Sequence, residues 1–105
     1  MKDDDKTRKP PWEKLVIRRV MQSTLIWAKP CSLFIASITA ASAGPAAAVI
    51  RNGNNEDADK IFDLAAPASS MAHGRFQPPL FFSKGIFVEV GANVTSVLVQ
   101  IRQEN

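Results

Sequence analysis

The feature that most constrains the fold is the alternation of apolar and polar residues over "IFVEVGANVTSVLVQIR", from Ile86 to Arg102. Side chains of a β-strand point alternately to opposite faces, so the pattern predicts two strands joined as a hairpin by a short turn at "GAN". The second face of the hairpin mixes Phe87 and Leu98 with charge, as an interface rim does, and makes both residues candidates for partner binding. The first face is uniformly apolar and must be covered; it consists of Ile86, Val88, Val90, Val97, Val99 and Ile101.

Short apolar stretches recur through the rest of the chain at a spacing of roughly ten residues, with turn residues between them. "NGNNED", Asn52–Asp57, predicts a turn because Asn and Gly tolerate positive φ, and "APASSMAHG", residues 66–74, predicts a loop. No stretch has a convincing helical period, although a helix is the alternative over the Ala-rich residues 40–48. The predicted strands cover residues 15–21, 24–28, 32–40, 46–51 and 59–64, with brief pairing at 75–77 and an apolar stretch at 80–82.

The length of 105 residues allows one domain with one modest core. Seven or eight short strands in a chain of this size predict an all-β fold, a small antiparallel β-sandwich or jelly-roll-like domain with an extended N-terminal arm. We assign residues 1–21 to the arm and residues 22–105 to the domain.

The 20 residues from Cys31 to Ile50 carry no charge. Read with a period of two, this run predicts buried strands, with Phe34 and Ile38 on one face and Ile35 and Thr39 on the other. Two alternatives compete with that interpretation: a signal segment comprising residues 1–43, with small residues before the cleavage site, and a membrane-spanning helix. Gly44 and Pro45 interrupt the run, and its many Ala, Ser and Thr residues lower its hydrophobicity well below that of typical membrane helices, so no membrane contact is expected.

Charge is concentrated near the N-terminus. Residues 1–20 hold seven basic and four acidic side chains, whereas residues 21–105 hold six of each. Pro10–Pro11 favours an extended path, and the following Trp12 would either anchor the arm in a partner's pocket or fold back onto the domain. The basic arm can contact an acidic protein surface, membrane or nucleic acid. Its candidate partner-binding residues are Lys6, Arg8, Lys9, Trp12, Arg18 and Arg19.

Residues for catalysis are scarce. Cys31 is the sole cysteine, which excludes an intrachain disulfide and predicts a buried packing role, and His73, the sole histidine, is predicted to lie in an exposed loop. The acidic residues around Asp57 do not have the spacing of an EF-hand loop, and the five Gly residues are too isolated for a phosphate-binding loop. We therefore predict a protein that is not an enzyme, with no catalytic residues, cofactor or metal.

Binding of nucleic acid through a sheet face requires aromatic residues interleaved with basic ones. Five of the six phenylalanines lie in strand patterns poor in Lys and Arg, and core packing accounts for them more simply; these are Phe34, Phe62, Phe81, Phe82 and Phe87. Nucleic acid is thus a disfavoured partner, with the basic arm as the remaining route to it.

The segments "PLFFSKGIFVEV" and "VTSVLVQIR", together with "AAAVIRNGNN", resemble the strand and turn motifs of small tailed-bacteriophage structural proteins. The likeness covers residues 24–102. It implies a non-enzymatic component of the virion, such as a capsid decoration or cement protein, with a head-tail connector or tail accessory as the alternative. The implied partners are the major capsid protein or other virion proteins and neighbouring copies of the chain. An exported small β-protein and a nucleic-acid-binding module remain the other two hypotheses.

Overall fold

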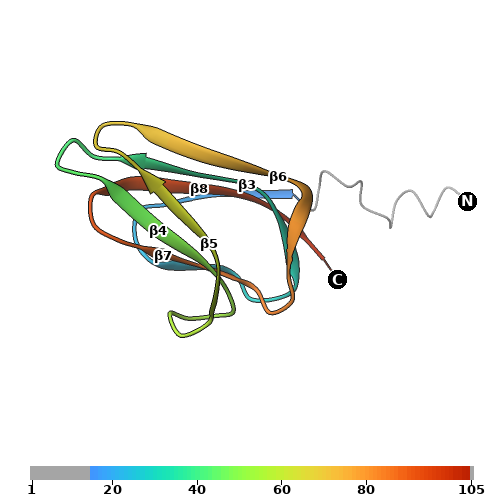
Figure 1. Cartoon of the computed structure of the whole chain (residues 1–105). Coiled ribbons are helices and arrows are strands. Elements are labelled where there is room, and N and C mark those ends of the chain that lie inside the picture. Colours follow the sequence, from blue (N-terminus) through green and yellow to red (C-terminus); the bar gives the residue numbers. More distant parts are fainter. Residues whose placement is uncertain (1–14, 105) are drawn as a thin grey trace, which may run out of the picture.

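A computed structural model describes residues 15–104 and shows two four-stranded antiparallel sheets packed face to face (Figure 1). The predicted all-β sandwich is thereby confirmed. The strands are β1 (Leu15–Val20), β2 (Thr24–Trp27), β3 (Cys31–Ala40), β4 (Ala46–Asn52), β5 (Asp59–Ala66), β6 (Met71–Phe82), β7 (Ile86–Val90) and β8 (Val94–Gln103).

The strand order follows a simple rule of pairing. Strand β1 pairs with β8, β2 with β7, β3 with β6 and β4 with β5, so the chain forms one long antiparallel ribbon folded over on itself. Additional pairing of β3 with β8 and of β4 with β7 closes each half into a sheet. The resulting sheets, β1-β8-β3-β6 and β2-β7-β4-β5, have the arrangement of a jelly roll.

The core lies between the two sheets and is built from alternate residues of each strand. The apolar face predicted for the C-terminal segment is buried: Ile86 and Val88 in β7, and Val97, Val99 and Ile101 in β8, are fully inaccessible, and Val90 packs partly buried against them. Leu33, Ile38, Ile50 and Phe82 complete the set of large side chains that are fully buried. Burial of this kind stabilises the fold by roughly 25 cal/mol per Å² of apolar surface.

The predicted hairpin is wrong in its pairing, although both of its strands exist. Strand β7 lies in one sheet and β8 in the other, so the turn at Gly91–Asn93 crosses between the sheets. Asn93 takes φ 63° in this turn, and the N–H of Gly91 donates to the carbonyl of Ala47 at 2.9 Å. Two strands that each bury one face can meet the same core from opposite sides, a choice that alternation alone does not resolve.

The uncharged run forms strands β3 and β4, and the Ala-rich residues 40–48 form strand ends and a turn rather than a helix. The predicted placement of Phe34 on the face of Ile38 is wrong, because the register shifts between Leu33 and Ile35 and leaves Phe34 on the outer side beside Arg102. Within residues 15–104, no helix is long and apolar enough to cross a membrane. The "NGNNED" turn is also confirmed, because it joins the paired strands β4 and β5. Gly53 permits the close approach there, since a Cβ at this position would collide with that of Ala58.

Two predicted boundaries change. Residues 15–20, assigned to the arm, form β1 and pair with β8 from Leu15↔Arg102 to Val20↔Val97, so the division after residue 21 falls inside the sandwich. Residues 71–74, predicted to be loop, begin the long strand β6. Strand β6 is an edge strand, where a Pro costs no hydrogen bond to a further strand, and it continues past Pro78 and Pro79 through a break in register.

Candidate interaction surface

The outer face of the β1-β8-β3-β6 sheet, here called the docking face, has side chains that oppose the buried ones. Because Val97, Val99 and Ile101 point into the core, the alternate residues of β8 and their register partners point outward. The docking face comprises Leu15, Ile17 and Arg19 of β1, Leu98, Gln100 and Arg102 of β8, Phe34, Ile35, Ser37 and Thr39 of β3, and Met71, His73, Arg75 and Phe81 of β6.

Large apolar side chains are exposed on the docking face. Ile17 is 63% exposed, Phe81 62% and Met71 59%, and they lie on the two edge strands β1 and β6. Between them, Leu98 and Ile35 are half-buried. Single exposed hydrophobic residues are ordinary, and these three exposed residues lie apart on the two edge strands, so a partner would have to cover the width of the sheet to bury all of them.

Charge on the docking face is almost entirely positive. Within residues 15–104, no carboxylate lies within ion-pair distance of Arg19 or Arg75. The Arg102 guanidinium pairs with Glu104, N–O 2.9 Å, and stands over the Phe34 ring, 5.4 Å from its centroid. The surface therefore suits a partner that presents apolar groups surrounded by carboxylates.

A groove of about 320 Å³ opens in the docking face beside β6. Its walls are aromatic, aliphatic and amide side chains, with one guanidinium at the rim; the lining residues are Phe34, Ile35, Arg75, Phe76, Gln77, Pro79 and Gln100.

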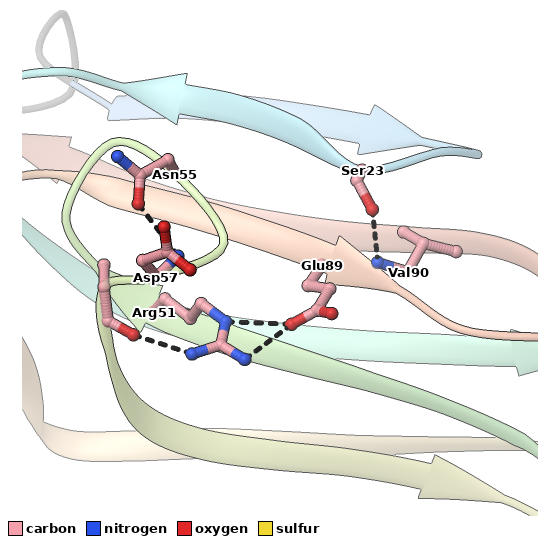
Figure 2. Close-up of polar contacts among 7 residues, drawn as sticks. Ser23, Arg51, Asn55, Asp57, Glu89 and Val90 are labelled. Atoms are coloured by element: carbon pink, nitrogen blue, oxygen red, sulfur yellow. Dashed lines mark hydrogen bonds and ion pairs between the residues drawn. The ribbon is translucent and has the colours of Figure 1, made fainter.

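On the outer face of the β2-β7-β4-β5 sheet, here called the opposite face, the Arg51 guanidinium is paired within the fold (Figure 2). Arg51 donates from Nε to a carboxylate oxygen of Glu89 at 2.9 Å, its Nη2 lies 2.7 Å from the same oxygen, and its Nη1 donates to the carbonyl of Ala58 at 2.7 Å. The Arg51 side chain is only 13% exposed. The apolar residues here are less exposed than those of the docking face, at 44% for Ile61 and 38% for Leu25.

The structure separates the residues that the sequence predicts to bind a partner. Leu98 and Arg19 are register partners on the docking face, whereas Phe87 lies on the opposite face beside Leu25. The expectation that Phe87 and Leu98 share one surface is therefore wrong, because β7 and β8 belong to different sheets. Arg18 opposes the buried Val99 and so lies on the inner side of the edge strand β1, where it is exposed. The predictions for Lys6, Arg8, Lys9 and Trp12 concern positions outside the described residues.

Sequence reasoning missed several docking-face residues. The sequence pattern predicts Phe81 to be a core residue, but Phe82 is the buried one of the pair and the alternation of β6 leaves Phe81 exposed to solvent. Ile17 lies between Val16 and Arg18 in β1, so it faces the side opposite to Val16 and Val20. This alternation predicts an exposed Ile17 once residues 15–20 are recognised as a strand. Arg75 belongs to the docking face because β6 begins at Met71 and pairs Arg75 with Ile35 of β3, so the strand is longer than the sequence predicts.

The titratable groups are dispersed. Cys31 is fully buried, as predicted, and its pKa is raised to about 11 by burial and then by the nearby negative charge of Glu104. His73 is exposed as predicted, but in strand β6 rather than in a loop. Within residues 15–104, no group of three or more His, Cys, Asp or Glu side chains is placed to hold a metal ion.

Comparison with models of known protein families and with curated proteins gives no match. The resemblance to phage structural proteins accordingly stays a prediction from the sequence, and the fold and the docking face carry the functional argument.

Proposed function

We propose that the protein is a non-enzymatic structural component of a phage particle, a decoration or cement protein that binds the major capsid protein through the docking face. The observation that carries the proposal is the combination on one face of exposed Ile17, Met71 and Phe81 with Arg19 and Arg75, which have no carboxylate partner within residues 15–104. Aromatic and Arg side chains supply much of the binding energy at protein interfaces.

The face is suited to binding without chemistry. A sheet buried on one side holds its outward side chains in fixed register, so apolar anchors and cations are presented without a large ordering cost. Opposite charge on the partner would guide encounter and fix orientation. Jelly rolls are frequent among viral capsid domains, a fold-level analogy that favours the virion over other settings.

The N-terminal arm supplies a second contact in this proposal. Its basic residues Lys6, Arg8 and Lys9 precede β1, an edge strand of the sheet that bears the docking face, so the arm begins next to that face. Ordering of the arm on assembly would link a subunit to the capsid or to a neighbouring copy. A head-tail connector or tail accessory would use the same surface on a different partner.

The exported-protein hypothesis has a structural cost. Processing after residue 43 would remove β1, β2 and β3, and β3 lies between β8 and β6 in its sheet. The intact mass of the protein from its native source distinguishes the two hypotheses, because a start at Gly44 would contradict the virion proposal.

The test uses particles made without this chain, to which purified protein is added and co-sedimented. We expect saturable binding at a fixed copy number, and cryo-electron microscopy of the saturated particles locates the site. The face variant Ile17→Asp/Phe81→Asp should bind at least about tenfold more weakly, the loss that corresponds to 1.4 kcal/mol.

The matched control is Ile61→Asp/Leu25→Asp, which places two carboxylates on the opposite face at residues that are also exposed. It should bind like the wild type. Loss of binding in this control with retention in the face variant would assign the interface to the opposite face. Absence of the chain from purified native particles would overturn the proposal.

A further inference from the structure

The groove in the docking face arises from a break in strand pairing. Strands β3 and β6 are in register at Leu33↔Leu80 and again at Ile35↔Arg75, so the single residue Phe34 faces the four residues 76–79. Pro78 and Pro79 have no N–H to donate to β3. The two strands separate over this stretch, and the space between them is the groove of about 320 Å³.

The walls of the groove are held in place from outside it. The Phe76 ring contacts the Phe62 ring of β5 edge-on, with centroids 5.0 Å apart, and the Arg102 guanidinium stands over Phe34. Pro79 adds a rigid apolar ring, while Gln77, Gln100 and Arg75 offer hydrogen-bond donors. Aromatic-lined grooves with such donors are the type that binds proline-rich segments in the extended polyproline II form.

We propose that this groove binds the chain's own segment Pro10–Trp12, with the Trp12 indole against Phe34. These three residues lie outside the described part of the chain. A Pro-Pro pair favours the extended form before binding and so loses little entropy on docking, and a tryptophan contributes a large apolar surface. A cavity of about 150 Å³ is enough to hold benzene, so the groove has room for an indole.

The distance from β1 to the groove is within reach of this segment. Leu15 pairs with Arg102, whose side chain stands over Phe34, and β8 is the one strand between β1 and β3. The groove between β3 and β6 lies two to three strand spacings from β1, or about 10–14 Å, and three residues of extended chain span about 10 Å, to which a tryptophan side chain adds its own length. The chain before Leu15 is therefore long enough for Trp12, three residues earlier, to dock in the groove of its own subunit.

The test is paramagnetic broadening in the full-length, ¹⁵N-labelled protein. A nitroxide is attached at His73→Cys, an exposed position on β6 two residues from Arg75. Native Cys31 stays unmodified because it is buried with a raised pKa. We expect the Trp12 indole N–H signal, assigned by its loss in Trp12→Phe, to lose most of its intensity. A nitroxide at Ala92→Cys should leave it intact, because this exposed turn position precedes Gln100 of the groove by eight residues, or about 25 Å of strand.

The variant Phe34→Ala should restore the Trp12 signal, while Phe81→Ala, which removes an exposed ring of the same face outside the groove, should not. Mixing ¹⁵N-labelled wild type with nitroxide-labelled protein of natural abundance should give no broadening. Broadening in that mixture alone would show that a neighbouring copy provides the segment and would overturn the proposal, as would an unaffected Trp12 signal. The measurement needs no particle, so its outcome is independent of the proposed function.

Discussion

The docking face and the opposite face belong to the same sandwich but differ in how their arginine and apolar side chains are paired and exposed. On the opposite face, Arg51 is satisfied by Glu89 and by the Ala58 carbonyl, so charge is consumed in holding strands together. On the docking face, Arg75 and Arg19 have no carboxylate beside them within residues 15–104, and Ile17 and Phe81 stand in solvent. An arginine that is paired within the fold, such as Arg51, contributes to stability. An arginine without such a pair, such as Arg75, can instead form an ion pair with a binding partner.

The largest difference between the core and the docking face is expected when each of two adjacent phenylalanines of β6 is replaced by alanine. Phe82 is fully buried and Phe81 is 62% exposed. Phe82→Ala should lower the free energy of unfolding by about 3–5 kcal/mol through lost burial and the cavity left behind. Phe81→Ala should change it by no more than about 0.5 kcal/mol. Urea denaturation measures both, and a large cost for Phe81→Ala would mean that the docking face is structural.

The dependence of stability on pH tests whether Cys31, on the inner side of the docking-face sheet, is shielded from water. Its pKa is raised to about 11 from 9.0, chiefly by burial, so the folded state keeps the proton that the unfolded chain gives up. The stabilisation is fully present below pH 9 and is lost as the pH rises through 11, by about 2 kcal/mol at pH 11. Denaturation midpoints from pH 8 to 11 should fall more steeply in wild type than in Cys31→Ala, and parallel curves would show that the thiol is not desolvated.

A third pair of variants compares the arginines of the two faces. Glu89→Ala should cost about 1–2 kcal/mol because it leaves the Arg51 guanidinium, 13% exposed, with the Ala58 carbonyl as its remaining partner. Arg75→Ala should change stability by no more than about 0.5 kcal/mol, since it loses no ion pair within residues 15–104. Thermal unfolding at low and high salt reads out both, and equal costs would remove the distinction between the faces.

The smallest expected effect on stability comes from the arm. Deleting residues 1–11 leaves every described strand intact, so the free energy of unfolding should change by less than about 1 kcal/mol, or a shift in Tm below roughly 4–8 °C. Association with particles should weaken in the same variant. An unfolded product would show that the arm is part of the core rather than an extension.

The sequence predicted the fold class and the buried positions because both follow from local rules. Alternation identified Val97, Val99 and Ile101 as core, and an Asn-Gly turn located the β4–β5 hairpin. It did not predict which strands share a sheet, since β7 and β8 bury equivalent faces and the same pattern serves a hairpin or a crossing between sheets. That one ambiguity placed Phe87 and Leu98 together when they lie on opposite faces.

The candidate site was predicted less well than the fold. Leu98 and Arg19 are on the docking face, but its most exposed residues, Ile17 and Phe81, were not named as partner-binding residues. An exposed Phe and a buried Phe have the same signature until the strand register is known. The groove could not be predicted from the sequence, because it depends on a break in the pairing of β3 with β6 that no local sequence motif indicates.

The pairing of β1 with β8 and of β8 with β3 has a consequence for biosynthesis. Strand β8 follows every other strand in the chain, yet it occupies the middle of the β1-β8-β3-β6 sheet. During translation, β1 and β3 are therefore synthesised before β8, the strand that lies between them. The uncharged segment that forms β3 and β4 leaves the ribosome before the strands that pack against it have been made. Contacts between such distant segments form slowly and expose apolar strands to association. We expect ribosome-bound chains that lack β8 to be open and dependent on chaperones, and to close only once residues 94–103 have left the exit tunnel.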